Sequence, residues 1–141
     1  MSTKILLVED YIIQSMGLWN LLEFWGYDMC EQVTSGEEAI IKAGQEKPDI
    51  VLMDINLDGD LNGIDAARQI MSRFGIPVIF TTSYSDGRTM EIAEAAGPAG
   101  YFVKPLDLYK LRSVIDAIMS KESRHFNRKS RKAVCASRSL N

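Results

Sequence analysis

Hydrophobic residues along the chain gather in five short runs, each preceded or followed by turn residues. The runs cover residues 5–8, 27–33, 50–53, 78–80 and 101–103. Short apolar runs bounded by turn signals are typical of buried strands. The pattern therefore predicts five β-strands.

The segments between these runs carry apolar residues at helical spacing, with three or four positions from one to the next. Residues 64–74 show this pattern, and Asn62 or Gly63 is expected to begin their helix. Residues 12–25 show it with Ile12, Ile13, Met16, Leu18, Leu21, Leu22 and Trp25. Such spacing places side chains on one side of a helix. We therefore expect a broad apolar face on each of these two helices.

Other local signals predict three further helices. Ser35 and Glu38 have the spacing of a capping box, which predicts a helix from about residue 35 to residue 43. A shorter helix is expected near residues 89–96, and a last one from about residue 106 to residue 120. Strands that alternate with helices predict an α/β fold, in which a parallel sheet is covered on both faces. The functional cleft of such a sheet lies at the carboxyl ends of the strands.

Polar residues follow four of the predicted strands. Glu9 and Asp10 follow the first strand, Asp54 the third, Thr82 the fourth and Lys104 the fifth. Carboxylates brought close together repel one another unless a cation compensates them. Oxygen ligands of this kind suit Mg²⁺, which usually completes its shell with water and phosphate oxygens. The sequence therefore predicts a magnesium site at which the lysine and the hydroxyl can contact a phosphoryl group.

Composition sets limits on the class of protein. A chain of 141 residues with 46% hydrophobic residues is expected to fold as one domain. No stretch has the length needed to cross a bilayer, and the first ten residues carry an apolar run of only four. We therefore expect a cytoplasmic protein with no membrane contact.

The net charge of −3 hides an uneven distribution. Residues 1–120 carry 9 Lys and Arg against 18 Asp and Glu, whereas residues 121–141 carry 7 against 1. An acidic body argues against nucleic-acid binding by this chain, because phosphate contacts need clustered basic residues. We expect a domain over residues 1–121, followed over residues 122–141 by a basic tail that is disordered or links to an output region.

Four motifs, in a fixed order, carry a resemblance to a known family. They are ILLVED at residues 5–10, DIVLMDIN at 49–56, PVIFTTS at 77–83 and YFVKP at 101–105. In these motifs the chain resembles the receiver domain of two-component response regulators, from residue 4 to about residue 120. The resemblance implies a doubly wound, CheY-like (flavodoxin-like) fold with five parallel strands in the order 2-1-3-4-5.

The resemblance also implies the roles of the site residues. Asp54 would accept a phosphoryl group from a sensor histidine kinase, a phosphotransfer protein or a small phosphodonor. Mg²⁺ would be held by the side chains of Asp10 and Asp54, by the backbone carbonyl of Asn56, and by Glu9 through water. Lys104 would neutralise the phosphoryl charge. No substrate turnover is implied beyond phosphorylation and dephosphorylation of the protein itself.

A switch belongs to the same resemblance. Thr82 would move toward the phosphoryl group, and Tyr101 would rotate into the space that Thr82 leaves. The surface that responds would comprise the helix near residues 89–96, the strand at 101–103 and the helix at about 106–120. Two copies of the chain can pair through such a surface.

Two hypotheses from other classes remain open at this point. One is a calcium-binding loop, because the spacing of a calcium loop is matched by Asp54, Asn56, Asp58, Gly59, Asp60, Asn62 and Asp65. The run of apolar residues before Asp54 argues against it, since a calcium loop of this type follows a helix. The other is a magnesium-dependent phosphohydrolase or nuclease, for which Glu9 and the Asp58-x-Asp60 pair supply acidic ligands.

Overall fold

The computed structural model describes residues 2–57, 61–83 and 86–121. The chain divides into two compact units, Met1–Asp107 and Leu108–Asn141. In the first unit strands and helices alternate, in the order β1 (Lys4–Val8), α1 (Ile12–Phe24), β2 (Asp28–Met29), α2 (Gly36–Glu46), β3 (Ile50–Asp54), α3 (Gly63–Phe74), β4 (Val78–Thr82), α4 (Gly87–Ala95) and β5 (Gly100–Val103). In the second unit residues 108–121 are helical.

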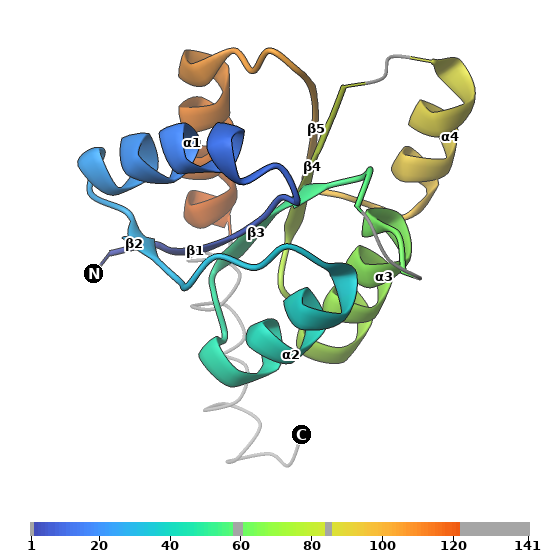
Figure 1. The fold of residues 1–141 in the computed structure, drawn as a ribbon, viewed down its shortest axis with the longest axis horizontal. Helices are drawn as coiled ribbons and strands as arrows, with labels where there is room; N and C mark the ends of the chain where they lie inside the picture. Colours follow the sequence, from blue (N-terminus) through green and yellow to red (C-terminus); the bar gives the residue numbers. More distant parts are fainter. Residues whose placement is uncertain (1, 58–60, 84–85, 122–141) are drawn as a thin grey trace, which may run out of the picture. The chain divides into compact units, whose positions relative to one another are not determined.

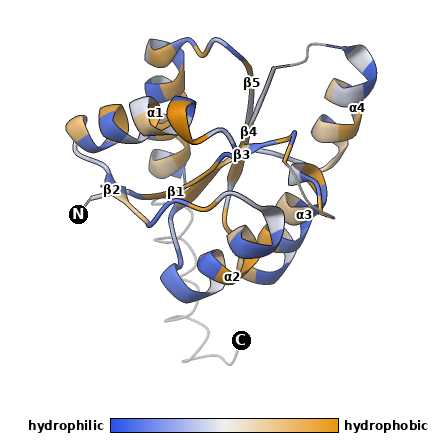
Figure 2. Ribbon diagram, in the orientation of Figure 1, coloured by the Kyte–Doolittle hydropathy of each residue, from blue (hydrophilic) through white to orange (hydrophobic). Residues whose placement is uncertain are grey.

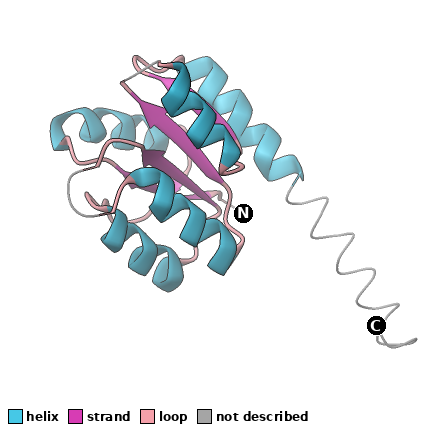
Figure 3. Cartoon of the chain, turned by 90° about the vertical axis from the view of Figure 1, so that its right-hand side faces the viewer, coloured by secondary structure: helices cyan, strands magenta, loops and turns pink. Residues whose placement is uncertain are grey.

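All five strands form one parallel sheet in the order β2-β1-β3-β4-β5 (labelled in Figure 1; strands are magenta in Figure 3). This order confirms the predicted α/β fold. Val8 pairs with Met53, and Thr82 pairs with Val103. The residues that follow these pairs therefore leave the sheet at the same edge, where the functional cleft was expected.

Both faces of the sheet are buried. One face joins a hydrophobic core with α2 and α3, to which the strands contribute Leu6, Val8, Val51, Met53, Val78 and Phe80. The alternate strand residues, which point to the other face, are buried as well: Ile5, Leu7, Ile50, Leu52 and Ile79. Figure 1 shows α1 on one side of the sheet and α2 with α3 on the other. The sheet is therefore doubly wound.

Side-chain caps fix where three helices begin. Ser35 accepts a hydrogen bond from the backbone N–H of Glu38, as the capping-box spacing predicted. Asn62 caps α3, so its start agrees with the prediction. Asp86 accepts from the backbone N–H of Thr89 and so begins α4 at Gly87, two residues before the predicted start. These bonds satisfy N–H groups that the first turn of a helix leaves unpaired.

The second strand is much shorter than the predicted run over residues 27–33. Only Asp28 and Met29 pair with β1, and Val33 makes a single further bridge to Val8. Between them, the chain is held by α1, because the indole N–H of Trp19 donates to the carbonyl of Cys30 at 3.3 Å. Cys30 itself is buried, and its backbone N–H still donates to the carbonyl of Ile5 in β1. The apolar pattern over residues 27–33 did not predict how few of these residues pair with β1.

The expectation of one broad apolar face on α1 was wrong. Ile12, Ile13 and Met16 are 54%, 78% and 54% exposed, whereas Ser15 and Leu22 are the buried residues of the helix. Figure 2 shows hydrophobic residues distributed along this helix. Apolar residues occur on more than one side of α1, so the spacing could not identify which side is buried.

Several expectations fall on residues outside the described ranges, among them the basic tail at 122–141 and the loop residues Asp58 and Asp60. The domain boundary near residue 121 therefore stays a prediction. Across the described ranges, no helix combines the length and the apolar character needed to cross a membrane.

Candidate functional site

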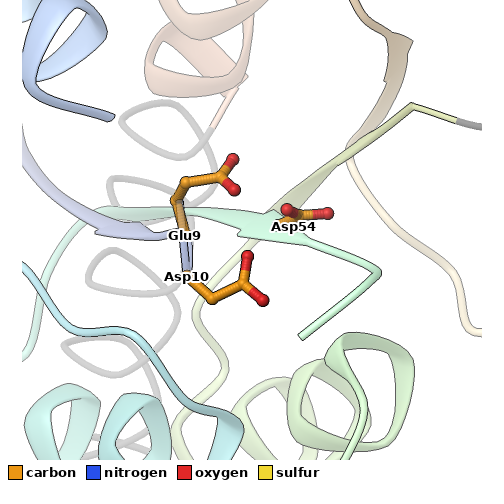
Figure 4. A group of neighbouring side chains, drawn as sticks. All are labelled: Glu9, Asp10 and Asp54. Carbon is orange, nitrogen blue, oxygen red and sulfur yellow. The ribbon is translucent and has the colours of Figure 1, made fainter. Parts of the chain in front are cut away.

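Three carboxylates meet at the carboxyl edge of the sheet. Glu9 and Asp10 follow β1 directly, and Asp54 is the last residue of β3, the neighbouring strand. Each offers a carboxylate oxygen, and these oxygens all lie within 4.8 Å of one another. Figure 4 shows the three side chains projecting from the ends of the two strands into one region. The site predicted from the strand ends is therefore assembled.

Burial differs among the three acids. Glu9 and Asp54 are only 6% and 4% exposed, whereas Asp10 is half-buried. Charged groups removed from water need an opposite charge or hydrogen-bond donors to remain ionised. Two buried carboxylates in contact with a third make this edge of the sheet the place where a cation is needed.

Lys104 supplies one positive charge. Its side-chain nitrogen lies 2.6 Å from Oε2 of Glu9 and 3.3 Å from Oδ2 of Asp54. The lysine follows β5, and its backbone N–H donates to the carbonyl of Thr82 at 2.8 Å. Lys104 therefore contacts both buried acids. The shorter contact with Glu9 was not predicted, because order along the chain does not give the relative depth of two acids at one strand end.

Burial and neighbouring charges shift the ionisation of the site. Burial and then the neighbouring Asp54 raise the pKa of Glu9 from its usual value of 4.5 to about 7, against the opposing effect of Lys104. For Lys104, burial alone would lower the pKa. The hydrogen bond with Glu9 and the charges of Asp54 and Glu9 outweigh burial, so the pKa of Lys104 is raised. One lysine does not fully compensate the acidic cluster.

Asn56 and Thr82 extend the site along β3 and β4. The backbone N–H of Asn56 donates to Oδ1 of Asp54 at 2.9 Å. The hydroxyl of Thr82, which is fully buried, donates to the side-chain oxygen of Asn56 at 3.0 Å. Both predicted residues therefore lie at the site. The contact between the asparagine amide and the hydroxyl was not visible in the sequence.

The acids border an open cleft of about 310 Å³. Its lining adds Tyr11 and Gln14, which the sequence analysis did not single out, and Ser83, which ends the PVIFTTS motif after the fourth strand. Tyr11 is the N-cap residue of α1, and Gln14 lies in the first turn of that helix. Tyr11 and Gln14 lie at the start of the helix that follows the acidic pair, and this position was the signal that could have identified them. The cleft gives a small phosphorylated molecule or side chain access to the carboxylates.

Tyr101 lies on β5, beside Phe80 of β4. Strand β4 therefore stands between Tyr101 and β3, which carries Asp54. The residue is half-buried against the hydrophobic core. Its hydroxyl oxygen is buried and has no hydrogen-bond partner among the described residues. Burial raises the pKa of this phenol. The cleft lining does not include Tyr101.

The geometry argues against the calcium-loop hypothesis. The residues before Asp54 form a buried strand rather than a helix. Asn62 and Asp65, two of the supposed ligands, are bonded to each other at the start of α3, where the backbone N–H of Asp65 donates to Oδ1 of Asn62 at 2.9 Å. Asp65 also pairs with Arg68 at 3.5 Å. The side chains of Asn62 and Asp65 therefore stabilise the start of α3.

The donor set of the cleft fits magnesium. Carboxylate oxygens from Glu9, Asp10 and Asp54 are hard ligands that lie close enough to share one ion. Burial and the nearby Asp54 raise the pKa of Glu9, so the charged form of this carboxylate is disfavoured in the metal-free cleft. A divalent cation would supply a compensating positive charge.

Comparison with known proteins decides the family. Residues 5–116 match the family described as the response regulator receiver domain. The chain belongs to this family. It is therefore a receiver domain that acts in phosphorylation-controlled signalling, and the hydrolase, nuclease and calcium-binding alternatives are not supported. Receiver domains in general bind Mg²⁺ at an acidic pocket and interact with histidine kinases or phosphotransfer proteins.

Individual relatives agree with this assignment. The chemotaxis protein CheY of Thermotoga maritima is 36% identical over 106 residues, which are 74% of this chain and 88% of CheY. The transcriptional regulatory protein PdtaR of Mycobacterium tuberculosis is 33% identical over 118 residues, 84% of this chain. The receiver domain spans only 57% of the length of PdtaR.

A solved structure matches the fold closely. The signal receiver domain of a modulated diguanylate cyclase from Desulfovibrio desulfuricans G20 superposes with a TM-score of 0.83 at 34% identity. The match covers 89% of this chain and 99% of that one.

Proposed function

We propose that Asp54 is the phosphoacceptor of this receiver domain. The observation that carries the proposal is the placement of Asp54 at the end of β3, where it is 4% exposed and lines the open cleft. Both carboxylate oxygens already have a donor, the backbone N–H of Asn56 on one and the ammonium of Lys104 on the other. Such contacts hold a carboxylate in one orientation toward an incoming group.

The transfer needs no general base. An ionised carboxylate is already a nucleophile, so an oxygen of Asp54 attacks the phosphorus of the donor. As the new oxygen–phosphorus bond forms, the bond from phosphorus to the donor breaks, and the donor atom keeps the electron pair. With a phosphohistidine donor that atom is a ring nitrogen of the partner kinase or phosphotransfer protein. With acetyl phosphate it is a carboxylate oxygen.

Charge compensation is the main task of the remaining residues. Asp10 and Asp54 would hold Mg²⁺ through their side chains, Asn56 through its backbone carbonyl, and Glu9 through water. When bound, the ion would neutralise negative charge on the transferred phosphoryl group. Lys104 would pair with a phosphoryl oxygen, a role supported by its present distance of 3.3 Å from Asp54.

A conformational response would follow from Thr82 and Tyr101. The hydroxyl of Thr82 would donate to a phosphoryl oxygen, and Tyr101 would turn toward the space beside β4. Among the described residues the buried hydroxyl of Tyr101 has no partner, and such a hydroxyl costs about 1–3 kcal/mol, which supports a second position of this ring. We propose that α4 and β5 carry the response. Pairing of two copies through this surface stays a prediction.

Intact mass after incubation with acetyl phosphate and magnesium tests the proposal. We expect the wild-type protein to gain one phosphoryl group, and the gain to be abolished by Asp54→Asn or by EDTA. Asp65→Asn, which changes a carboxylate of the α3 cap, is the matched control and should be phosphorylated like the wild type. Phosphorylation of Asp54→Asn at the wild-type level would contradict the proposal, as would repeated hydrolysis of acetyl phosphate in both proteins without modification of either.

A further inference from the structure

Asn56 is attached to two functional groups at once. Its backbone N–H donates to Asp54 at 2.9 Å, and its side-chain oxygen accepts the proton of the Thr82 hydroxyl at 3.0 Å. The first contact involves the main chain and is independent of the side chain. The second depends on the amide oxygen of the asparagine. The two contacts can therefore be separated by substitution.

The Thr82 hydroxyl has only one proton to donate. While that proton lies on the bond to the Asn56 oxygen, the hydroxyl cannot donate it to a phosphoryl oxygen on Asp54. A response that uses Thr82 as a donor must therefore break the Asn56–Thr82 hydrogen bond. Thr82 is fully buried, so solvent does not readily take the place of the asparagine as acceptor.

We propose that Asn56 is a positioning residue. Its side-chain oxygen competes with the phosphoryl group for the proton of the Thr82 hydroxyl. The inference rests on the proposed function, since it assumes that Asp54 carries the phosphoryl group. The competition holds Thr82 in its resting position in the unphosphorylated protein. This hydrogen bond then contributes to how readily phosphorylation engages the switch.

Substitution of Asn56 should leave the rest of the site in place. The residue is exposed, so Asn56→Ala removes the amide without opening a cavity in the core. The variant keeps the backbone N–H bonded to Asp54 and the backbone carbonyl proposed as a metal ligand. The affinity for Mg²⁺ alone is measured in the same variant, so that an effect on the metal is separated from an effect on the phosphoryl mimic.

Beryllofluoride with magnesium, a mimic of the phosphoryl group, provides the test. Loss of a competing hydrogen bond should tighten binding of the mimic to Asn56→Ala about threefold to tenfold relative to the wild type. Asn20→Ala, which changes an exposed asparagine on α1, is the matched control and should bind like the wild type.

A double-mutant cycle separates competition from a general structural effect. Thr82→Val removes the proton and keeps the shape of the side chain. In that background Asn56→Ala should change the affinity for beryllofluoride by less than about twofold. The same effect of Asn56→Ala with and without the hydroxyl would overturn the inference, as would weaker binding to the single variant.

The resting position of Thr82 gives a second readout. In the metal-free protein, NMR couplings that report the χ1 angle of Thr82 should indicate one rotamer in the wild type and a mixture in Asn56→Ala. Identical couplings in both proteins would contradict the positioning role. If the wild type gains no phosphoryl group from acetyl phosphate, the proposed function itself fails. If it is phosphorylated but Asn56→Ala binds beryllofluoride like the wild type, only this inference fails.

Discussion

The side-chain nitrogen of Lys104 lies closer to Glu9 than to Asp54, at 2.6 Å and 3.3 Å respectively. The lysine after β5 is thereby tied to the acidic pair after β1, although two other strands, β3 and β4, lie between β1 and β5 in the sheet. A cation that enters the cleft would meet a lysine already engaged with one of the acids. Protonation of Glu9, its ion pair with Lys104 and the binding of a metal all involve the same carboxylate, so a change in one is expected to affect the other two.

The first prediction concerns pH and the metal-free protein. Glu9 has a pKa of about 7 in the folded state, above its usual value of 4.5, so the folded state binds this proton more tightly than the unfolded state. The contribution of Glu9 is present in full below its unfolded pKa and is lost as the pH rises through about 7. The free energy of unfolding in EDTA should therefore fall between about pH 5 and about pH 8.

Urea denaturation at a series of pH values measures this dependence. Glu9→Gln should flatten most of the fall, because the amide cannot lose a proton. Glu37→Gln changes an exposed carboxylate in the first turn of α2 and should keep the wild-type slope. A slope that is the same in all three proteins would refute the assignment of the effect to Glu9.

The second prediction concerns the link between the phosphoryl group and β5. Lys104→Ala should leave the fold intact, since the lysine lies at the edge of the sheet and contributes no side chain to its hydrophobic core. The ring signals of Tyr101 in NMR spectra should shift with beryllofluoride in the wild type and lose that shift in Lys104→Ala.

The control is Lys42→Ala, which removes a lysine of α2 that pairs with Glu31. This variant should respond like the wild type. A Tyr101 shift of normal size in Lys104→Ala would mean that the lysine does not couple the site to the strand.

The third prediction concerns the backbone that carries Asp54. A Cβ atom on Gly63 would lie 2.1 Å from the carbonyl oxygen of Asp54 and 2.9 Å from Cα of Ile55. Both neighbours are main-chain atoms, of Asp54 itself and of the residue after it, so Gly63→Ala must displace them. We expect a loss of about 1–3 kcal/mol in the free energy of unfolding.

Gly17→Ala is the matched control, because a Cβ atom there would meet nothing within 4 Å inside α1. It should stabilise the protein by about 0.5–1 kcal/mol, the usual gain from alanine in a helix. Guanidinium denaturation compares the two variants, and equal stabilities would show that the close approach of α3 to β3 is not rigid.

The fourth prediction ranks the acidic residues by calorimetric titration with magnesium. Asp10→Ala should weaken binding at least about tenfold, because it removes a carboxylate from the cleft. The double change Asp58→Ala, Asp60→Ala should leave binding within about threefold of the wild type. The prediction for the loop pair comes from the sequence, in which both residues stand farther along the loop than Asp54. The reverse ranking would revive a loop-based metal site.

Much of this fold could be predicted from the sequence because its signals are local. The start of α3 follows from the capping residue Asn62, and β3 follows from a fully apolar run that ends at Asp54. Once the strands were placed, the parallel order brought Glu9, Asp54 and Lys104 to one edge of the sheet. Strand ends therefore predicted the site without any knowledge of distances.

The features that the sequence did not give depend on contacts between distant segments. The bond between Trp19 and the carbonyl of Cys30, just after β2, joins α1 to this segment, and the apolar pattern over residues 27–33 does not predict it. The preference of Lys104 for Glu9 depends on the depth of each side chain in the cleft. The bond between Thr82 and Asn56 depends on the stagger of β3 and β4.

The position of the phosphoryl group tests the central claim most directly. The wild-type protein, phosphorylated with acetyl phosphate and magnesium, can be reduced with borohydride, which converts a phosphorylated aspartate to homoserine. Peptide mass spectrometry then locates the homoserine. We predict homoserine at position 54 in the phosphorylated wild type and at no other aspartate, and none in a sample without acetyl phosphate. Homoserine at position 10 or 58 with aspartate retained at position 54 would contradict the account.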